Sequence, residues 1–489
     1  MEAVIREIGC RKQLLIDDWI IEDTWQAPRK IHHPRKHPEN PLLEPDRPWE
    51  ANTLILDGSV APRPGSGYRM WYNTFSNRPR SGEDTPAHAY RVCYAESDDG
   101  VEWHKPNLGL WAWCGSRDNN LVLCDDMTTE DGRPMTNHSG AQSFSLLMEP
   151  VGPAAEDGLL HAVTKAVPPD APEGPPDGFS LRVKGGICHI ISEDGIRWRP
   201  HPEKYLLIAG HSDTPNNIHW NPTIGRYMCF VRPNNYAGPV KRRSAVSLSS
   251  DLREWTQSTI VMRADELDPI DQIYGMGAFP YEDMWLGMLE VYDMRIGAID
   301  VQLAHSRDGL RWERLPMREP ILPRGEEGTW DAMGIHTSCR PIIGDDCVLL
   351  YYDGMAGRHS ARTSAKSIGL ASWRLDGFIS RRAYQEGEVL TLPFRCEGNR
   401  LFVNCCTKPE GALRVEVHSV DTESGDQLNS TSVAKGYSAA DCISFFDRDS
   451  VDAEILWQGQ RNLAPFKGRV IRLKFHLSYA DLYGFQPRR

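Results

Sequence analysis

Residues 192–198 read Ser-Glu-Asp-Gly-Ile-Arg-Trp, and this heptad recurs with small changes in the first 380 residues. The further copies, which share the pattern Ser-x-Asp-(Gly/Leu)-x-x-Trp, span residues 97–103, 249–255 and 306–312. A degenerate fifth copy covers residues 372–378, with Phe378 where the Trp stood. Self-similarity at intervals of this length is the signature of a repeat architecture, in which each copy marks one structural unit.

The heptad has the chemistry of a turn between strands. Each copy follows a short β-like run, such as Tyr90–Ala95 or Val301–Ala304. An Asp carboxylate can accept hydrogen bonds from turn amides, Gly adopts a positive φ without cost, and Trp fills the space between neighbouring sheets. We therefore interpret the repeated Asp as a structural residue rather than a catalytic one.

A second aromatic and aliphatic run precedes four of the copies. The clearest examples are Tyr68–Tyr72, Arg226–Val231, Met284–Leu289 and Val348–Tyr352. Four strands per unit and five units predict a five-bladed β-propeller, whereas a β-helix would have much shorter rungs. The blades are expected at about 45–108, 115–203, 208–262, 266–320 and 325–382.

The flanks of the repeat predict the remaining organisation of an all-β chain. Residues 1–44 form an N-terminal segment, and its apolar run Lys12–Ile21 is expected to close the ring. Residues 45–384 form the five-bladed β-propeller. Residues 385–489 contain alternating strands without the heptad, which predicts a C-terminal β-sandwich.

Composition limits the partners and the compartment. The 15 Trp, 16 Tyr, 41 Gly and 35 Pro suit short strands and many turns, and the formal charge of −12 disfavours nucleic acid or an anionic membrane as a partner. No apolar run approaches the roughly 20 residues of a membrane span. The 12 scattered Cys have no metal-ligand spacing, and no signal peptide is visible, so we expect a cytoplasmic protein with no cofactor. A structural calcium ion at the propeller axis stays an open alternative, and the oligomeric state is not indicated.

Several of these strings resemble a known group of enzymes. The strings are Tyr68–Tyr72, Ala95–Gly100, Leu303–Trp312, Ile471–Phe475 and Ala480–Phe485. Together with the five blades and the terminal sandwich, they resemble the furanosidase-type propeller clan, which includes glycoside hydrolase families 32 and 43. The resemblance implies a carbohydrate substrate and a site where the blades converge. The Trp-Met-Asn-Asp-Pro-Asn-Gly, Arg-Asp-Pro and Glu-Cys strings of family 32 are absent, so no catalytic triad is carried over.

Cleavage of a glycosidic bond requires an acid for the leaving oxygen and a carboxylate that acts as nucleophile or base. The innermost strand of each blade lines the central channel, so acids near the start of these strands are the candidates. We predict catalytic roles for Glu50, Asp213, Asp271, Glu290 and Asp331, and substrate binding by Asp57, His138, Asn217, Tyr274 and His336. Glu290 lies on the next strand among apolar residues, where desolvation would raise the pKa of its carboxyl group, as suits a general acid.

Structural roles compete with these assignments. Trp49-Glu50 and Trp330-Asp331 are matched dipeptides whose carboxylates could simply cap the start of a strand. The paired acids Asp17 and Asp18 are interpreted mainly as caps of the expected closing strand.

The first functional hypothesis is a glycoside hydrolase that acts on a small furanoside or oligosaccharide through paired carboxylates in the channel. There are two non-enzymatic alternatives: a propeller that binds carbohydrate without cleaving it, and a scaffold that binds another protein. A glycoside phosphorylase is a variant of the first hypothesis, because phosphate would need cationic groups beside the acids. The candidates for that role are Arg232, Lys241, Arg242, Arg243 and His336.

Overall fold

The computed structural model describes the chain from residue 5 to residue 489, with gaps. The residues outside the description are 1–4, 80–85, 125–126, 129–134, 137–139, 149–151, 169–170, 172, 175–182, 211, 213, 234–240, 269–271, 360, 362–363, 421–430 and 460. The described part consists of β-strands and two short 3₁₀ segments, η1 (Gly152–Ala155) and η2 (Ala464–Phe466), without an α-helix. This confirms the all-β fold class.

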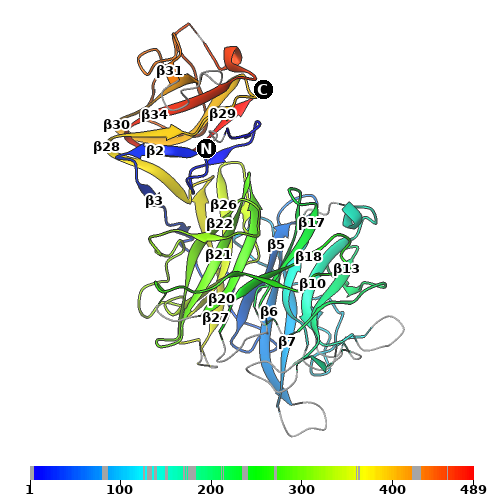
Figure 1. Cartoon of the computed structure of the whole chain (residues 1–489). Helices are drawn as coiled ribbons and strands as arrows, with labels where there is room; N and C mark the ends of the chain where they lie inside the picture. Colours follow the sequence, from blue (N-terminus) through cyan, green and yellow to red (C-terminus); the bar gives the residue numbers. More distant parts are fainter. Residues whose placement is uncertain are drawn as a thin grey trace.

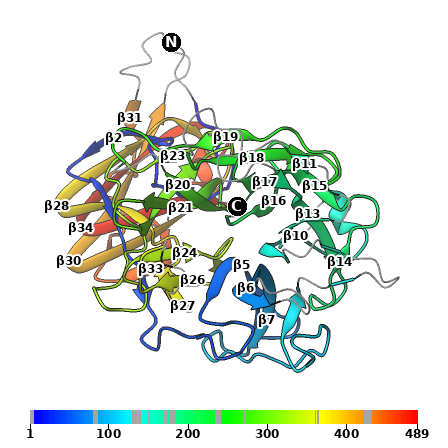
Figure 2. The same cartoon turned by 90° about the horizontal axis from the view of Figure 1, so that it is seen from below.

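The first three blades are antiparallel sheets in chain order, and Figure 2 shows the blades arranged around a common centre. Blade one contains β5 (Leu54–Pro62), β6 (Tyr68–Pro79), β7 (Pro86–Ser97) and β8 (Leu121–Leu123). Blade two contains β9 (Gln142–Leu146), β10 (Leu160–Ala166), β13 (Gly186–Ser192), β14 (Arg199–Pro200) and β15 (Leu206–Ala209). Blade three contains β16 (Asn217–Asn221), β17 (Arg226–Val231), β18 (Ser244–Ser249) and β19 (Thr259–Met262). Outside the blades, β11 (Glu173–Gly174) pairs with β12 (Val183–Lys184).

Blades four and five complete the ring. Blade four contains β20 (Ile273–Tyr281), β21 (Met284–Asp293), β22 (Ala298–Ser306) and β23 (Glu313–Arg314). Blade five contains β24 (Gly334–Thr337), β25 (Ile342–Ile343), β26 (Cys347–Met355) and β27 (Lys366–Arg374). Its outermost strand is β4 (Arg35–Lys36), which comes from the N-terminal segment and pairs with β27. The last blade is therefore closed by the beginning of the chain.

The expected closing strand lies elsewhere. Within Lys12–Ile21, β1 (Gln13–Leu14) pairs with β34 (Val470–Arg488) of the sandwich. Leu15 and Ile20 are fully buried in the hydrophobic core of the sandwich. Leu14 and Ile16 are instead buried in the core of blades four and five. The apolar run thus contributes to both cores, and the polar dipeptide Arg35–Lys36 closes the ring.

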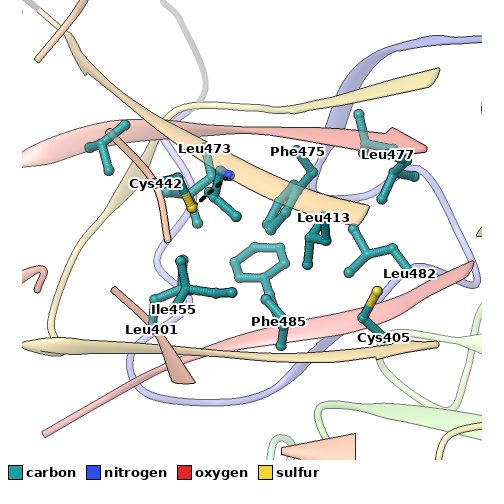
Figure 3. Packing of buried hydrophobic residues seen from close by; sticks show 14 of the residues in the cluster. Leu401, Cys405, Leu413, Cys442, Ile455, Leu473, Phe475, Leu477, Leu482 and Phe485 are labelled. Atoms are coloured by element: carbon teal, nitrogen blue, oxygen red, sulfur yellow. Dashed lines mark hydrogen bonds between the residues drawn. The ribbon is translucent and has the colours of Figure 1, made fainter. Parts of the chain in front are cut away.

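The sandwich lies beyond one end of the propeller (Figure 1). It contains β28 (Ile379–Thr391), β29 (Phe394–Arg395), β30 (Arg400–Val420), β31 (Thr431–Val433), β32 (Phe445–Phe446) and β33 (Asp449–Ile455), together with β34, β1, β2 (Ile21–Trp25) and β3 (Arg29–Ile31). The long strands β30 and β34 pair along both layers, with register shifts where they bend. Leu413 faces Leu477 in one layer and Val403 faces Phe485 in the other, and the side chains between the layers form the core (Figure 3).

The heptad turns have the predicted hydrogen bonds. In the copy at 306–312, the Asp308 carboxylate accepts from the amides of Leu310 and Arg311, both at 2.8 Å. The Ser306 hydroxyl accepts from the amide of Gly309, whose φ is 75°. Asp99, Asp194 and Asp251 accept equivalent pairs of amides in the other copies. The structural interpretation of the repeated Asp is confirmed.

Replacing this carboxylate tests the interpretation. Asp308→Ala removes the acceptor for two turn amides and is expected to lower the free energy of unfolding by on the order of 1–2 kcal/mol in denaturant titrations. Glu193→Ala, at an exposed position of an equivalent turn, is the control and should change stability by less than about 0.5 kcal/mol. Equal stability of the two variants would contradict the assigned role.

Candidate active site at the propeller axis

One position on the second strand of every blade carries a polar residue. The register locates it: Tyr68, Leu160, Tyr227 and Trp285 each pair with the first Ser of a heptad turn, and Val348 pairs with Trp373 in the degenerate copy. Five residues further along the chain stand Asn73, Lys165, Arg232, Glu290 and Asp353. In blades one to four these residues occupy equivalent places, at the opposite end of the blades from the heptad turns. In blade five Ser372 pairs with Leu349 rather than Val348, so Asp353 is grouped with them by its hydrogen bond to the next blade.

Four of these five residues hydrogen bond with the beginning of the next blade. The bonds join Ser143 N to Asn73 Oδ1 at 3.1 Å, Arg232 Nη2 to Tyr274 O at 2.5 Å, Thr337 N to Glu290 Oε1 at 3.1 Å, and Leu56 N to Asp353 Oδ1 at 2.7 Å. Lys165 bonds instead to Gln142 of its own blade, at 3.1 Å. Because each partner lies on an innermost strand, these polar side chains gather around the axis.

Three buried carboxyl groups lie where blades four, five and one meet. Glu290 and Asp353 come from second strands, and Asp57 comes from the innermost strand β5. Within the described chain, Glu290 Oε2 and Asp57 Oδ1 are buried without a hydrogen-bond partner. A buried acceptor without a hydrogen bond lowers the stability of the fold unless a ligand or a water molecule binds to it. These two oxygens therefore mark a candidate ligand-binding site.

The environment separates the pKa values of two of these acids. Burial raises the pKa of Glu290 to about 8, and the neighbouring charges of Asp57 and Asp353 add to the effect. Burial, with a smaller contribution from Asp353, raises the pKa of Asp57 to about 6. Near pH 7 Glu290 is therefore protonated in most molecules, whereas Asp57 is ionised in most. A pair of this kind can supply an acid and an anion at the same time.

His336 is oriented by the third acid. Its Nδ1 lies 3.0 Å from Asp353 Oδ2, and the ring is buried. Although burial opposes the charged form, Asp353 holds the pKa of His336 above its usual value. Its Nε2 is buried without a partner among the described residues, so in the protonated ring this atom can donate a hydrogen bond to a ligand.

Aromatic and cationic side chains surround the histidine. The ring of Tyr274 lies 5.1 Å from that of His336 and 4.8 Å from that of His359. The guanidinium groups of Arg232 and Arg242 lie 4.8 and 5.5 Å from the Tyr274 ring. Burial lowers the pKa of His359, and the positive charges of Lys366, His336, Arg242 and Arg232 lower it further. A cationic region therefore adjoins the acids.

A glycine packs against the buried Glu290 carboxyl group. A Cβ atom at Gly275 would lie 2.3 Å from Thr214 Oγ1 and 3.0 Å from Glu290 Oε2. Any larger side chain at this position would therefore press on the carboxyl oxygen that has no partner.

The structure brings together five of the ten predicted site residues. Glu290, Asp57, Tyr274 and His336 share the surroundings described above. Asn217 lies on the adjoining innermost strand β16, where its amide donates to Met276 O at 3.2 Å and its Oδ1 is buried without a described partner. The predicted residues Asp213, Asp271 and His138 lie outside the described residues.

Glu50 and Asp331 belong to a different, repeated arrangement. Glu50 accepts from Tyr72 at 2.6 Å and pairs with Lys105 at 2.8 Å. Asp331 accepts from Tyr352 at 3.1 Å and pairs with Lys36 at 2.5 Å. Both carboxylates are buried and engaged with a Tyr and a Lys, so the structure favours the structural alternative for the two matched dipeptides.

Asp353 is a site residue that the sequence analysis did not select. The acids predicted from the sequence lie mainly near the start of innermost strands, whereas Asp353 lies on the second strand β26. Asp353 and Glu290 are comparable because each accepts a hydrogen bond from a backbone amide on the innermost strand of the next blade. This similarity depends on contacts between blades, which the sequence alone does not show.

Comparisons with known proteins do not assign the chain to a family. No family model and no curated protein sequence matches it. Among solved structures, a β-1,2-mannobiose phosphorylase from Listeria innocua is similar at 13% identity, with 72% of this chain and 97% of that chain covered and a TM-score of 0.43. An N-acetylgalactosamine deacetylase from F. plautii is similar at 14% identity, with 72% and 96% covered and a TM-score of 0.46. Likenesses this distant assign no activity, and the resemblance to families 32 and 43 stays a prediction.

Within the described residues, no group of three or more His, Cys, Asp or Glu side chains is arranged to hold a metal ion. No helix in that part of the chain is long and apolar enough to cross a membrane.

The raised pKa of Glu290 makes stability depend on pH. The folded protein keeps the Glu290 proton up to about pH 8, whereas the unfolded chain releases it near pH 4.3, so stability falls as pH rises between these values. Glu290→Gln removes this loss. From pH 5 to pH 8 the variant should gain stability relative to wild type, by at most about 1.4 kcal/mol per pH unit, in denaturant titrations.

Glu50→Gln is the matched control, because Glu50 is an equally buried glutamate outside the cluster. The Glu50→Gln substitution removes the charge that pairs with Lys105 and should lower the free energy of unfolding at pH 7 by up to about 3–5 kcal/mol. Parallel pH dependence of wild type and Glu290→Gln would show that Glu290 does not hold a proton at neutral pH.

Proposed function

We propose that the protein cleaves glycosidic bonds, with Glu290 as the general acid and Asp57 as its anionic partner. The observation that supports this most directly is the pair of buried carboxyl groups with pKa values of about 8 and about 6, each with an oxygen free of described partners. The substrate class we propose is a small furanoside or oligosaccharide, as the family resemblance implies.

The chemistry follows from the protonation states. Glu290 gives its proton to the glycosidic oxygen as the bond to the anomeric carbon breaks, and the departing sugar leaves as an alcohol. Asp57 either attacks the anomeric carbon directly or removes a proton from the water that attacks it. His336, oriented by Asp353, is proposed to donate from Nε2 to a sugar hydroxyl, and Tyr274 adds an aromatic face beside it.

Phosphorolysis is the second candidate, and the cationic region favours it. Arg232, Arg242 and Lys366 are close enough to His359 to lower its pKa, and His336 lies among them beside the acids. A phosphate oxygen held there would attack the anomeric carbon in place of water, while Glu290 protonates the leaving oxygen as before. The products would be a sugar phosphate and an alcohol.

A screen of purified protein against chromogenic furanosides and pyranosides, with and without inorganic phosphate, tests both candidates. On the substrate found, Glu290→Gln and Asp57→Asn should each reduce kcat by at least about 10²-fold and leave the fold intact by circular dichroism. Glu254→Gln, at an exposed position, is the activity control and should match wild type. Turnover that requires phosphate identifies a phosphorylase.

Two results would contradict the proposal. Full activity in both axis variants would exclude Glu290 and Asp57 from the chemistry. Measurable sugar affinity without turnover on any substrate of the panel would favour the non-catalytic carbohydrate-binding alternative.

The pH profile tests the division of roles. Asp57 must be ionised and Glu290 protonated, so kcat/KM should be bell-shaped, with limbs near pH 6 and pH 8 and a maximum near pH 7. Because the two carboxyl groups interact, the apparent pKa values read from the two limbs belong to the pair and not to either residue alone. In Asp57→Asn the acidic limb should move or disappear in the residual activity, and a profile that is flat between pH 5 and pH 9 would refute the assignment.

A further inference from the structure

Trp25 is unusual among the tryptophans of the chain. Fourteen of the 15 Trp residues are buried or partly buried in the cores or between blades, and all 15 lie in the described part. Trp25 alone is exposed, with 51% of its surface accessible. It ends the strand β2 at the edge of the sandwich sheet. Single exposed apolar side chains are common on protein surfaces, so the surroundings of Trp25 decide whether it has a role.

The register shows which side chains share the face of Trp25. It pairs with Glu388 of β28, and Glu388 pairs with His476 of β34. The residues that alternate with them, Val389 and Phe475, are fully buried in the sandwich core. Trp25 and its polar neighbours therefore lie on the outer face of the sheet.

A hollow of about 200 Å³ opens beside the indole on this face. Its lining includes Trp25, Asp23, Glu388, His418, Arg472 and Lys474. Lys474 pairs with Glu388 at 2.8 Å, and His418 pairs with Glu416 at 3.1 Å. These pairs hold donors and acceptors in place around an aromatic surface.

We propose that the Trp25 hollow binds an uncharged glycan. An aromatic ring offers an apolar surface to the C–H face of a sugar, and fixed carboxylate and cationic groups can accept from and donate to its hydroxyl groups. The lining contains two acids, Asp23 and Glu388, and two permanent cations, Arg472 and Lys474. This balance suits a neutral ligand and disfavours a polyanion.

This hollow is separate from the axis site. The heptad turns of blades four and five face the sandwich, because Arg307 pairs with Asp17 at 2.6 Å and Asp376 pairs with Lys12 at 2.9 Å. The polar cluster at the axis lies at the opposite end of the blades. The Trp25 hollow would thus hold a glycan without taking part in its cleavage, an inference that rests on the proposed carbohydrate function.

Affinity electrophoresis of the full chain tests the proposal. Native gels would contain mannan, arabinan or β-glucan as neutral probes and polygalacturonate as the anionic probe. We expect at least one neutral polymer to retard the wild type, Trp25→Ala to weaken that binding at least tenfold, and Trp25→Tyr to retain most of it. Tyr384→Ala is the matched control and should behave as wild type, because Tyr384 is also an aromatic on this sheet and is 62% exposed, but it lies outside the hollow.

The outcomes are distinguishable from those of the axis experiments. Glu290→Gln should lose turnover and keep the retardation. Absence of retardation by every neutral polymer, equal retardation of wild type and Trp25→Ala, or stronger retardation by polygalacturonate would each overturn the glycan site. Retardation that depends on Trp25 in a protein without turnover would instead refute the proposed catalysis alone.

Discussion

The innermost strand of each blade presents backbone amides that must find partners at the axis, and this requirement organises the site. An unpaired buried amide is costly, so the neighbouring blade supplies an acceptor. Asn73 does so for blade two, Glu290 for blade five and Asp353 for blade one. In blades four and five the acceptor is a carboxyl group, and a carboxyl group has a second oxygen. In Glu290 the structural bond occupies one oxygen, and the other has no described partner.

The second oxygen distinguishes the roles of the acids. Glu290 Oε1 is held by Thr337, whereas Oε2 has no described partner, and burial outweighs the stabilising amide bond in setting its pKa near 8. Asp353 uses both oxygens, one for Leu56 and one for His336, which makes it a positioning residue. Asp57 keeps a free oxygen and a lower pKa. In the proposed mechanism Glu290 is the acid, Asp57 is the anion and Asp353 positions His336.

The sequence predicted those features that depend on local chemistry. The heptad fixed strand, turn and blade number, because its Asp, Gly and Trp act within seven residues. Glu290 was predicted from its apolar neighbours. Asp353 was missed because its role depends on contacts with Leu56 and His336, which the sequence does not show. The dipeptides Trp49-Glu50 and Trp330-Asp331 suggested function because the Tyr and Lys partners of their acids are separate from them in the chain. The closing strand Arg35–Lys36 has only two residues and carries no periodic signal.

The same N-terminal segment ties the two domains into one unit. Residues 13–31 supply β1, β2 and β3 to the sandwich, and the chain then closes the propeller with β4. Buried ion pairs join the segment to the turns of blades four and five. A propeller without its sandwich would therefore leave the strands that lead to β4 without partners, and blade five would lose the support for its outer strand. Because Glu290 and Asp353 depend on the closed ring for their anchoring bonds, the sandwich contributes to the geometry of the axis site without touching it.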